Sequence, residues 1–384
     1  MQKFNWIHTI LIMILIFGVT TLVYLYSAGF RLERSKRHEI NFKKTGMVSA
    51  KSIPEGASVY IDALLLTATN DTIAGIEPGQ RHLKIERRGF VPWEKDIEVF
   101  EELVTDITAV LVTQSPRLDP LTNTGATFPN ISPSLSKLAY FSKDEGTPGV
   151  MIMPTGGVIE MLRSTPSAAV KDTKARKYSD GKSIEWSPDE KELLIEGINK
   201  RFYLVNLETD VEQIMDSPDT VRKQWADRLL KKRQAFVEKL VELPEDIKTV
   251  ALSDRAIWAP DEKKFLYINQ NGDNLEYKVY NLEKPIPVGE KMESIVFTTN
   301  RNATQPKINW YSDSFHLILV EGNIANDKKG TISIIRIDGS NRTEVYNNTL
   351  YSDQVFSAPG GDKLIILTSY KSGDQTDLYT VSLR

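Results

Sequence analysis

Hydrophobic residues are concentrated in one long stretch near the start of the chain. Residues 7–26 read IHTILIMILIFGVTTLVYLY and contain no Asp, Glu, Lys or Arg. A hydrocarbon core about 30 Å thick needs roughly 20 helical residues, so the pattern predicts a transmembrane helix within an anchor of residues 1–27. The alternative is a cleaved signal peptide, because Ser27-Ala28-Gly29 resembles a cleavage site made of small residues.

A polar and basic segment follows over residues 28–46, and it is predicted to be a juxtamembrane stalk. Its cations serve either a solvated tether or a contact with anionic lipid headgroups. Only Lys3 precedes the apolar stretch, whereas several cations follow it, namely Arg31, Arg34, Lys36, Arg37, Lys43 and Lys44. Taken alone, this asymmetry favours a cytoplasmic location for the rest of the chain.

Between residues 47 and 113 the pattern changes to an alternation of apolar and polar residues. Leu83 and Ile85 fall on one face of residues 82–86, and residues 94–99 and 105–112 alternate in the same way. Period-two segments bounded by Pro and Gly are typical of half-buried antiparallel strands. About five such strands predict a small β-sandwich.

Several residues of this stretch resemble the PEGA domain, which is named after Pro-Glu-Gly-Ala. The run SIPEGASVYID occupies residues 52–62, and Pro78-Gly79 and Arg88-Gly89-Phe90 follow. The resemblance implies a non-catalytic, surface-associated module that is commonly found outside the cytoplasmic membrane. Ala63 stands where the family often has Gly, which argues against a tight two-residue turn at that point.

Residues 114–127 contain Pro, Gly and small polar residues and are interpreted as a linker. The alternative is a strand between Arg117 and Thr127 that completes the last sheet of the following domain. Such a strand would close the domain and cover an edge that otherwise invites association.

From residue 128 to residue 384 one pattern recurs, consisting of a strand, a turn of the Ser/Ala-Pro-Asp type and an apolar strand. The proline-equivalent positions are 133, 188, 260, 312 and 359, so the spacings are 55, 72, 52 and 47 residues. A period of about 50 residues is typical of four-stranded propeller blades. The pattern predicts a β-propeller of five blades, or of six if a degenerate repeat is present.

Tryptophan and aspartate recur at fixed places in this repeat. Trp186, Trp258 and Trp310 each lie two residues before the proline position, and Asp189, Asp261 and Asp313 each lie one residue after it. Catalysis needs a single asymmetric arrangement of groups, whereas a residue repeated in every unit indicates a role in folding. The tryptophans are therefore interpreted as core residues between blades, and the aspartates as turn formers.

The whole unit resembles the TolB-like propeller repeat, whose signature approximates Trp-Ser-Pro-Asp-Gly-Lys-x-Leu-x-Tyr. The second and third units match best, whereas the fourth has Ser312 for Pro and the fifth has Ser357 for Trp. Together with the PEGA resemblance, this implies a mainly β protein displayed outside the cytoplasm, typical of a bacterial cell envelope.

The longest spacing contains an insertion at residues 217–243, which is predicted to be a helix capped by Ser217-Pro218-Asp219. Its apolar stripe comprises Val221, Trp225, Leu229, Phe236, Leu240 and Leu243. The stripe either packs on the propeller or docks a partner. The candidate partner-binding residues are Arg222, Lys223, Trp225, Arg228, Lys231 and Arg233.

Composition then narrows the chemistry. The 384 residues carry 48 basic and 51 acidic side chains, and a net charge of −3 argues against nucleic acid as a partner. The absence of cysteine excludes disulfides, iron–sulfur clusters, thiolate zinc sites and cysteine nucleophiles. The 4 histidines have no ligand-like spacing. No catalytic, cofactor-binding or metal-binding residue is predicted.

These patterns predict a membrane-anchored, extracytoplasmic binding or scaffold protein that is not an enzyme. It would be a single-pass protein of the cytoplasmic membrane, contacting the bilayer through residues 7–26, and its propeller would bind a protein or a cell-envelope polysaccharide. One alternative is a propeller hydrolase acting on glycan or peptide. Another is an intracellular regulatory platform, as the flanking charges suggest.

Overall fold

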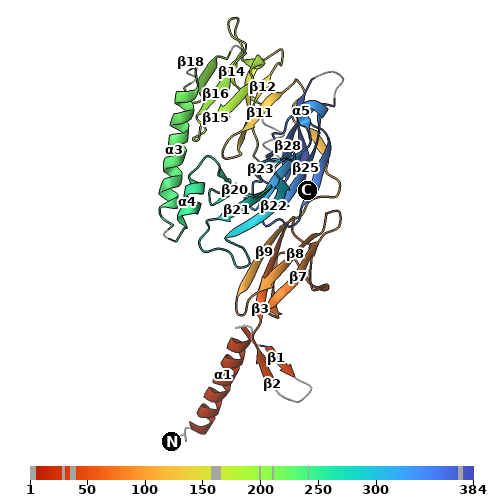
Figure 1. Ribbon diagram of the computed structural model, residues 1–384. Helices are drawn as coiled ribbons and strands as arrows, with labels where there is room; N and C mark the ends of the chain where they lie inside the picture. The colour runs from red at the N-terminus through yellow and green to blue at the C-terminus, as the bar shows by residue number, and fades with distance from the viewer. Residues whose placement is uncertain are drawn as a thin grey trace, which may run out of the picture. The chain divides into compact units, whose positions relative to one another are not determined.

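The computed structural model describes residues 6–27, 31–34, 40–156, 166–198, 200–209, 212–240, 242–370 and 375–384 (Figure 1). By its internal contacts the chain divides into two units. The first comprises residues 1–111 together with 285–291, and the second comprises residues 112–284 and 292–384.

Helix α1 spans Trp6–Ser27, and its described side chains, those of residues 9–24, are all exposed. Among the residues that the structure describes, no helix is both long enough and apolar enough to cross a membrane. The predicted transmembrane helix and the single-pass localisation are therefore wrong.

The predicted stalk contains two short strands. Strand β1 (Arg31–Arg34) pairs antiparallel with β2 (Ile40–Lys43). The rest of the segment before residue 40, residues 28–30 and 35–39, lies outside the described residues.

Seven strands of the first unit form two sheets around one core. One sheet has the order β6-β3-β9, with β3 at Gly46–Ile53, β6 at Asp71–Ile76 and β9 at Val104–Val110. The other has the order β5-β4-β7-β8, with β4 at Ser58–Ile61, β5 at Leu64–Ala68, β7 at Gly79–Glu86 and β8 at Trp93–Val99. The core includes Val48, Val59, Ile85, Trp93 and Ile107. Strands β3 and β9 run parallel, whereas only antiparallel pairing was predicted.

A two-residue turn joins β4 to β5, contrary to the expectation from Ala63. Ile61 pairs with Leu64, and the two residues between them have positive φ angles, 49° at Asp62 and 66° at Ala63. Two-residue hairpin turns of this kind require positive φ at both positions. The missing glycine therefore does not remove the turn, and Ala63 adopts the left-handed conformation instead.

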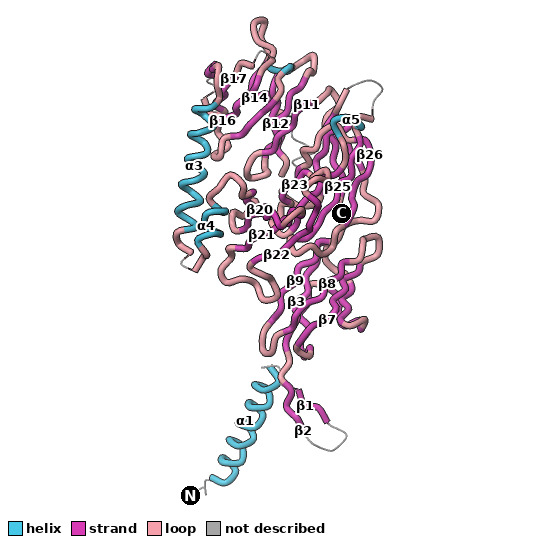
Figure 2. The backbone as a smooth tube through the Cα atoms, in the orientation of Figure 1, coloured by secondary structure: helices cyan, strands magenta, loops and turns pink. Residues whose placement is uncertain are grey.

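The second unit contains five four-stranded antiparallel sheets (Figure 2). The first two comprise β11 (Thr127–Ile131), β12 (Lys137–Ser142), β13 (Gly149–Pro154) and β14 (Ser167–Lys171), then β15 (Ser183–Trp186), β16 (Glu192–Glu196), β17 (Phe202–Asn206) and β18 (Glu212–Met215). The next two comprise β19 (Ile257–Trp258), β20 (Lys264–Asn271), β21 (Asn274–Asn281) and β22 (Glu293–Asn300), then β23 (Lys307–Trp310), β24 (His316–Glu321), β25 (Lys329–Arg336) and β26 (Thr343–Thr349). The fifth comprises β27 (Phe356–Ser357), β28 (Lys363–Thr368), β29 (Asp377–Ser382) and β10 (Leu118–Pro120). Up-and-down sheets repeated in this way are blades of a β-propeller.

The fifth blade joins the two ends of the propeller sequence. Strand β10 pairs with β29, with Leu118 opposite Val381, so part of the 114–127 segment supplies the fourth strand. Asp377 reinforces this closure because its Oδ1 accepts hydrogen bonds from the Thr122 hydroxyl and from the Gly125 amide, both at 2.9 Å.

The first turn of every blade has the same backbone geometry. In each blade the second residue after the proline position has a left-handed φ angle, between 55° and 61°. These residues are Leu135, Glu190, Glu262, Ser314 and Gly361, and the backbone amide of each forms a turn hydrogen bond. Only the fifth blade places glycine, the residue best suited to this conformation, at that position.

The tryptophans of the second, third and fourth blades connect each of these blades to the element before it. Trp186 Nε1 donates to the Asn130 carbonyl of the first blade at 3.0 Å, and Trp310 Nε1 donates to the Ile257 carbonyl of the third blade at 2.9 Å. Trp258 Nε1 instead donates at 3.0 Å to the Ala251 carbonyl, which belongs to helix α4 (Glu245–Ala251). The inserted helices therefore occupy the place of a neighbouring strand beside the third blade.

Helix α3 (Asp219–Val237) runs from the second blade to the third (Figure 1). Val221 and Trp225 pack with Leu194 of the second blade. At the other end, Val237 and α4 pack with Phe265 of the third blade. Of the two roles predicted for the apolar stripe, packing on the propeller accounts for these side chains.

Candidate functional site

Two cavities open along the inner strands of the propeller. The larger has a volume of about 1010 Å³ and the smaller about 490 Å³. Asn130, at β11, and Gln354, just before β27, line both cavities. The two cavities therefore adjoin. Residues from four blades line the larger cavity, and residues from all five blades line the smaller one.

The larger cavity is lined by hydroxyl and amide side chains and by apolar residues, among them Phe128, Ile324 and Leu367. The polar lining includes Thr127, Ser183, Gln305, Asn323 and Ser352. Ile324 belongs to the short helix α5 (Ile324–Asp327). Such side chains donate and accept hydrogen bonds without a net charge, so this surface can bind peptide groups or sugar hydroxyls.

Three charged side chains also line the larger cavity, namely Lys182, Lys307 and Asp353. All three are exposed, and none forms an ion pair with another of the described residues. Their charges are therefore available to a ligand, and their sum is one positive charge.

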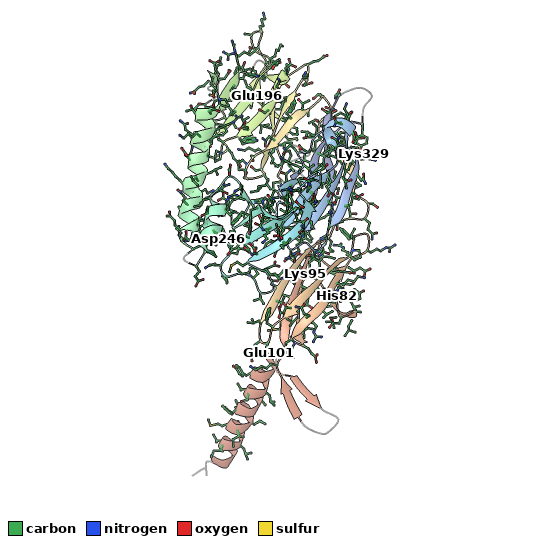
Figure 3. All side chains as sticks on the ribbon, in the orientation of Figure 1. His82, Lys95, Glu101, Glu196, Asp246 and Lys329 are labelled. Atoms are coloured by element: carbon green, nitrogen blue, oxygen red, sulfur yellow. The ribbon has the colours of Figure 1, made fainter. Side chains whose placement is uncertain are left out.

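The backbone before β15 holds Lys182 at this cavity. The Lys182 amide donates to the Glu196 carbonyl at 2.8 Å. Gly181 precedes it, and a Cβ there would lie 2.4 Å from the Phe141 ring, so only glycine fits. Glu196, labelled in Figure 3, also accepts the Ser183 hydroxyl at 3.1 Å. The first residues of β15 are thus fixed by the neighbouring strand β16 and by the first blade.

The smaller cavity has more aromatic and proline walls. Trp186, Trp258 and Trp310 line it, together with Pro188 and Pro260. Because each indole N–H is already bonded to a main-chain carbonyl, the tryptophans supply apolar surface and no free donor. Their role as core residues between blades, predicted from the repeat, agrees with these bonds.

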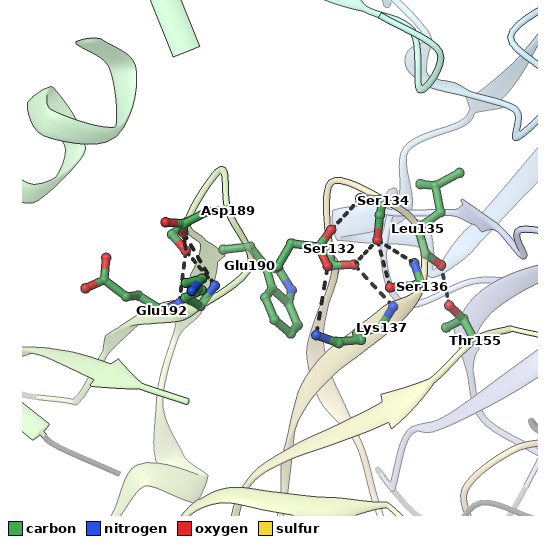
Figure 4. A network of polar contacts seen from close by, with 12 residues as sticks. Ser132, Ser134, Leu135, Ser136, Lys137, Thr155, Asp189, Glu190 and Glu192 are labelled. Atoms are coloured by element: carbon green, nitrogen blue, oxygen red, sulfur yellow. Dashed lines mark hydrogen bonds and ion pairs between the residues drawn. The ribbon is translucent and has the colours of Figure 1, made fainter. Parts of the chain in front are cut away.

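The turns of the first two blades are joined by a network of polar contacts (Figure 4). Glu190 Oε1 accepts the Ser134 amide at 2.6 Å, which joins the turn of the second blade to that of the first. Asp189 accepts the Ser187 hydroxyl at 2.6 Å, and this hydrogen bond lowers the pKa of Asp189. Asp189 thus forms the turn, as the repeat predicted.

Three of the six candidate partner-binding residues hold α3 against the propeller. Arg222 Nε lies 3.1 Å from Glu185 Oε2, and this pairing raises the pKa of Arg222. Trp225 is 6% exposed and donates to Glu192 at 3.2 Å. Arg228 pairs with Asp189 at 3.1 Å.

The other three candidates do not form ion pairs with the described part of the propeller. Lys223 and Lys231 are exposed on α3 and have no ion-pair partner among the described residues. Arg233 lines the smaller cavity, with its guanidinium carbon 5.2 Å from the centre of the Trp258 ring. The six side chains therefore do not form one continuous surface.

Sequence reasoning did not select Lys182, Lys307, Asp353 or Gln354. None of them belongs to the recurring turn motif, and their only sequence signal is that each is a polar residue close to the start of an inner strand. Within the described ranges, no group of three or more His, Asp or Glu side chains is arranged to hold a metal ion.

A family comparison identifies the two-sheet part of the first unit. The PEGA domain model matches residues 45–115. Residues 45–115 are a PEGA domain. The resemblance carried by SIPEGASVYID is therefore confirmed, and the PEGA domain accounts for the sandwich of β3 to β9. No curated protein sequence matches the chain.

Solved structures similar to the chain include propellers of several kinds. TolB from Acinetobacter baumannii has 13% identity and a TM-score of 0.27, with 79% of this chain and 60% of that chain covered. Oligogalacturonate lyase from Vibrio parahaemolyticus has 9% identity and a TM-score of 0.29, with 71% and 94% covered. The RRP9 WD40 repeats have 8% identity and a TM-score of 0.31, with 71% and 99% covered. This chain thus spans about three fifths of the Acinetobacter TolB chain.

Proposed function

We propose that the protein is a non-catalytic binding protein whose propeller holds a segment of a partner protein in the larger cavity. The observation that carries the proposal is the cavity of about 1010 Å³ with three exposed charges that are free of internal ion pairs. Ligand cavities typically have volumes of about 300–1,000 Å³, so this one can hold several residues of an extended chain.

The chemistry of the lining favours a peptide. Side-chain amides and hydroxyls match the donors and acceptors of a peptide backbone, and Lys182, Lys307 and Asp353 can fix its register by charge. Gln305 is already oriented, because its Nε2 donates to the Ala303 carbonyl at 2.7 Å and its Oε1 accepts the Tyr277 hydroxyl at 3.0 Å. A lining fixed in this way costs little entropy on binding.

The exposed face of α3 gives a second contact for the same partner. Lys223 and Lys231 lie two turns apart on this helix and are exposed. We assign to them a supporting role, because exposed charges act mainly on the rate of association.

The test places a photo-crosslinking amino acid at Lys182 or at Lys307 in the full chain, in the cells that make the protein. Lys174 is the matched control, because it is an exposed lysine that lines neither cavity. Both cavity positions should give the same protease-sensitive adduct, and Lys174 should not.

Reversing both charges, with Lys182→Glu and Lys307→Glu together, should lower the yield of this adduct about ten-fold. Equal adducts from Lys174 would contradict the proposal. An adduct destroyed by glycosidases and not by proteases would indicate a polysaccharide, and release of a shortened ligand would indicate the hydrolase alternative.

A further inference from the structure

The smaller cavity contains a cation that has no acceptor. Arg233 is half-buried and lines this cavity, yet its guanidinium makes no hydrogen bond or ion pair with any described residue. Its one contact of note is with the ring of Trp258, at 5.2 Å. Burial lowers the pKa of Arg233. A guanidinium has five N–H donors, and a partly desolvated charge without acceptors is costly.

The other charges around this cavity are already paired. Glu185 is bonded to Arg222, and Glu262 lies 2.7 Å from Lys232. The charge of Glu262 also acts on Arg233, since it partly offsets the lowering of the Arg233 pKa by burial. Glu262 forms its ion pair with Lys232, however, and neither acidic residue forms an ion pair or hydrogen bond with Arg233. The side-chain amide of Gln354, which lines the same cavity, also has no partner among the described residues. Two unused donor groups, from α3 and from the fifth blade, therefore open into one hollow.

We propose that the smaller cavity binds a ligand with an apolar body and a single carboxylate, with Arg233 as the charge partner and Gln354 as a second donor. The planar guanidinium matches a carboxylate by two parallel hydrogen bonds. One free cation balances one negative charge, whereas a phosphate carries nearly two. Trp186, Trp310 and the two prolines supply the apolar surface, and a volume of about 490 Å³ accommodates a small molecule or the end of a peptide.

This inference is independent of the partner proposed for the larger cavity, because its test needs no partner. The probe is 3-phenylpropionate, titrated into the full chain by calorimetry. Its neutral isostere, 3-phenylpropionamide, and inorganic phosphate are titrated in parallel. We expect weak, saturable binding of the carboxylate at about millimolar concentration, and at least about ten-fold weaker binding of the amide and of phosphate.

The variant Arg233→Gln should weaken carboxylate binding by about ten-fold or more, and Gln354→Ala by a few-fold. Lys239→Gln is the matched control, since it removes one exposed cation near the end of the same insertion, outside both cavities. Arg233→Lys keeps the charge but loses the planar pair of N–H donors that the guanidinium offers a carboxylate. Its affinity for the carboxylate should therefore lie between those of Arg233→Gln and the unaltered protein.

Equal binding of the carboxylate and the amide by the unaltered protein would overturn the proposal, and this comparison does not depend on whether a variant folds. Failure of the probe to bind saturably would also overturn it. So would unchanged affinity in a folded Arg233→Gln protein, as judged by its melting temperature.

Discussion

Glu262 gives a direct test of the strain in the blade turns. Its φ of 55° lies in the left-handed region, where a residue with a Cβ pays roughly 1–2 kcal/mol. Glycine avoids this cost but adds about 0.4–1 kcal/mol of entropy to the unfolded chain. The free energy of unfolding should therefore be higher in Glu262→Gly than in Glu262→Ala by about 0.5–1 kcal/mol.

Comparing Glu262→Gly with Glu262→Ala isolates the backbone term. Both variants lose the exposed ion pair with Lys232, so its small contribution cancels. The next residue, Lys263, is exposed and does not have positive φ. There the order should reverse, and Lys263→Ala should be more stable than Lys263→Gly by about 0.5–1 kcal/mol.

The assay is scanning calorimetry of the full chain, with urea unfolding as a second measurement. For a domain of this size a difference of 1 kcal/mol shifts Tm by about 2–4 °C, so the expected shift is about 1–4 °C. The reasoning fails if Glu262→Gly is no more stable than Glu262→Ala, or if both positions show the same sign.

Three other perturbations test the closure, the turns and the tryptophans. Asp377→Ala should destabilise the propeller by about 3 kcal/mol, because it leaves two donors at the closing strand, the Thr122 O–H and the Gly125 amide, without their acceptor; urea unfolding would measure this, and Asp377→Asn should cost less. The hydrogen bond from Ser187 lowers the folded-state pKa of Asp189, so its stabilising contribution is present above the unfolded value of about 3.9 and is lost as the pH falls through the folded pKa. Urea midpoints between pH 5 and pH 2 should accordingly fall less steeply in Asp189→Asn, and an unchanged slope would contradict this. Trp310→Phe removes a bond between blades and should cost about 2 kcal/mol, with Trp310→Ala costing more.

The apolar stretch near the amino terminus shows where pattern alone was insufficient. Its composition predicted a membrane-spanning anchor, and the localisation and bilayer contact were derived from that prediction. The described helices do not support it. A hydropathy pattern reports only apolar content along the chain, so it is not by itself evidence of a membrane-spanning helix.

The sequence by itself determined the β-units and their turns. Alternation of side chains, proline and aspartate at fixed positions, and the recurring tryptophan are local signals, because strand geometry and turn chemistry act over a few residues. They identified all five turns, at residues 133, 188, 260, 312 and 359. The left-handed φ angle two residues later in each turn is known only from the structure. The same local signals identified the PEGA domain through residues 52–62.

Only the tertiary structure decided the parallel pairing of β3 with β9, the placement of α3 and α4 beside the third blade, and the two cavities. It also separated the six basic and aromatic candidates of α3, pairing Arg222 and Arg228 with acidic residues and leaving Arg233 in a cavity. These features join residues that are far apart in the chain. Which charges find partners and which stay free depends on distances across blades, and no periodicity within a segment encodes those distances.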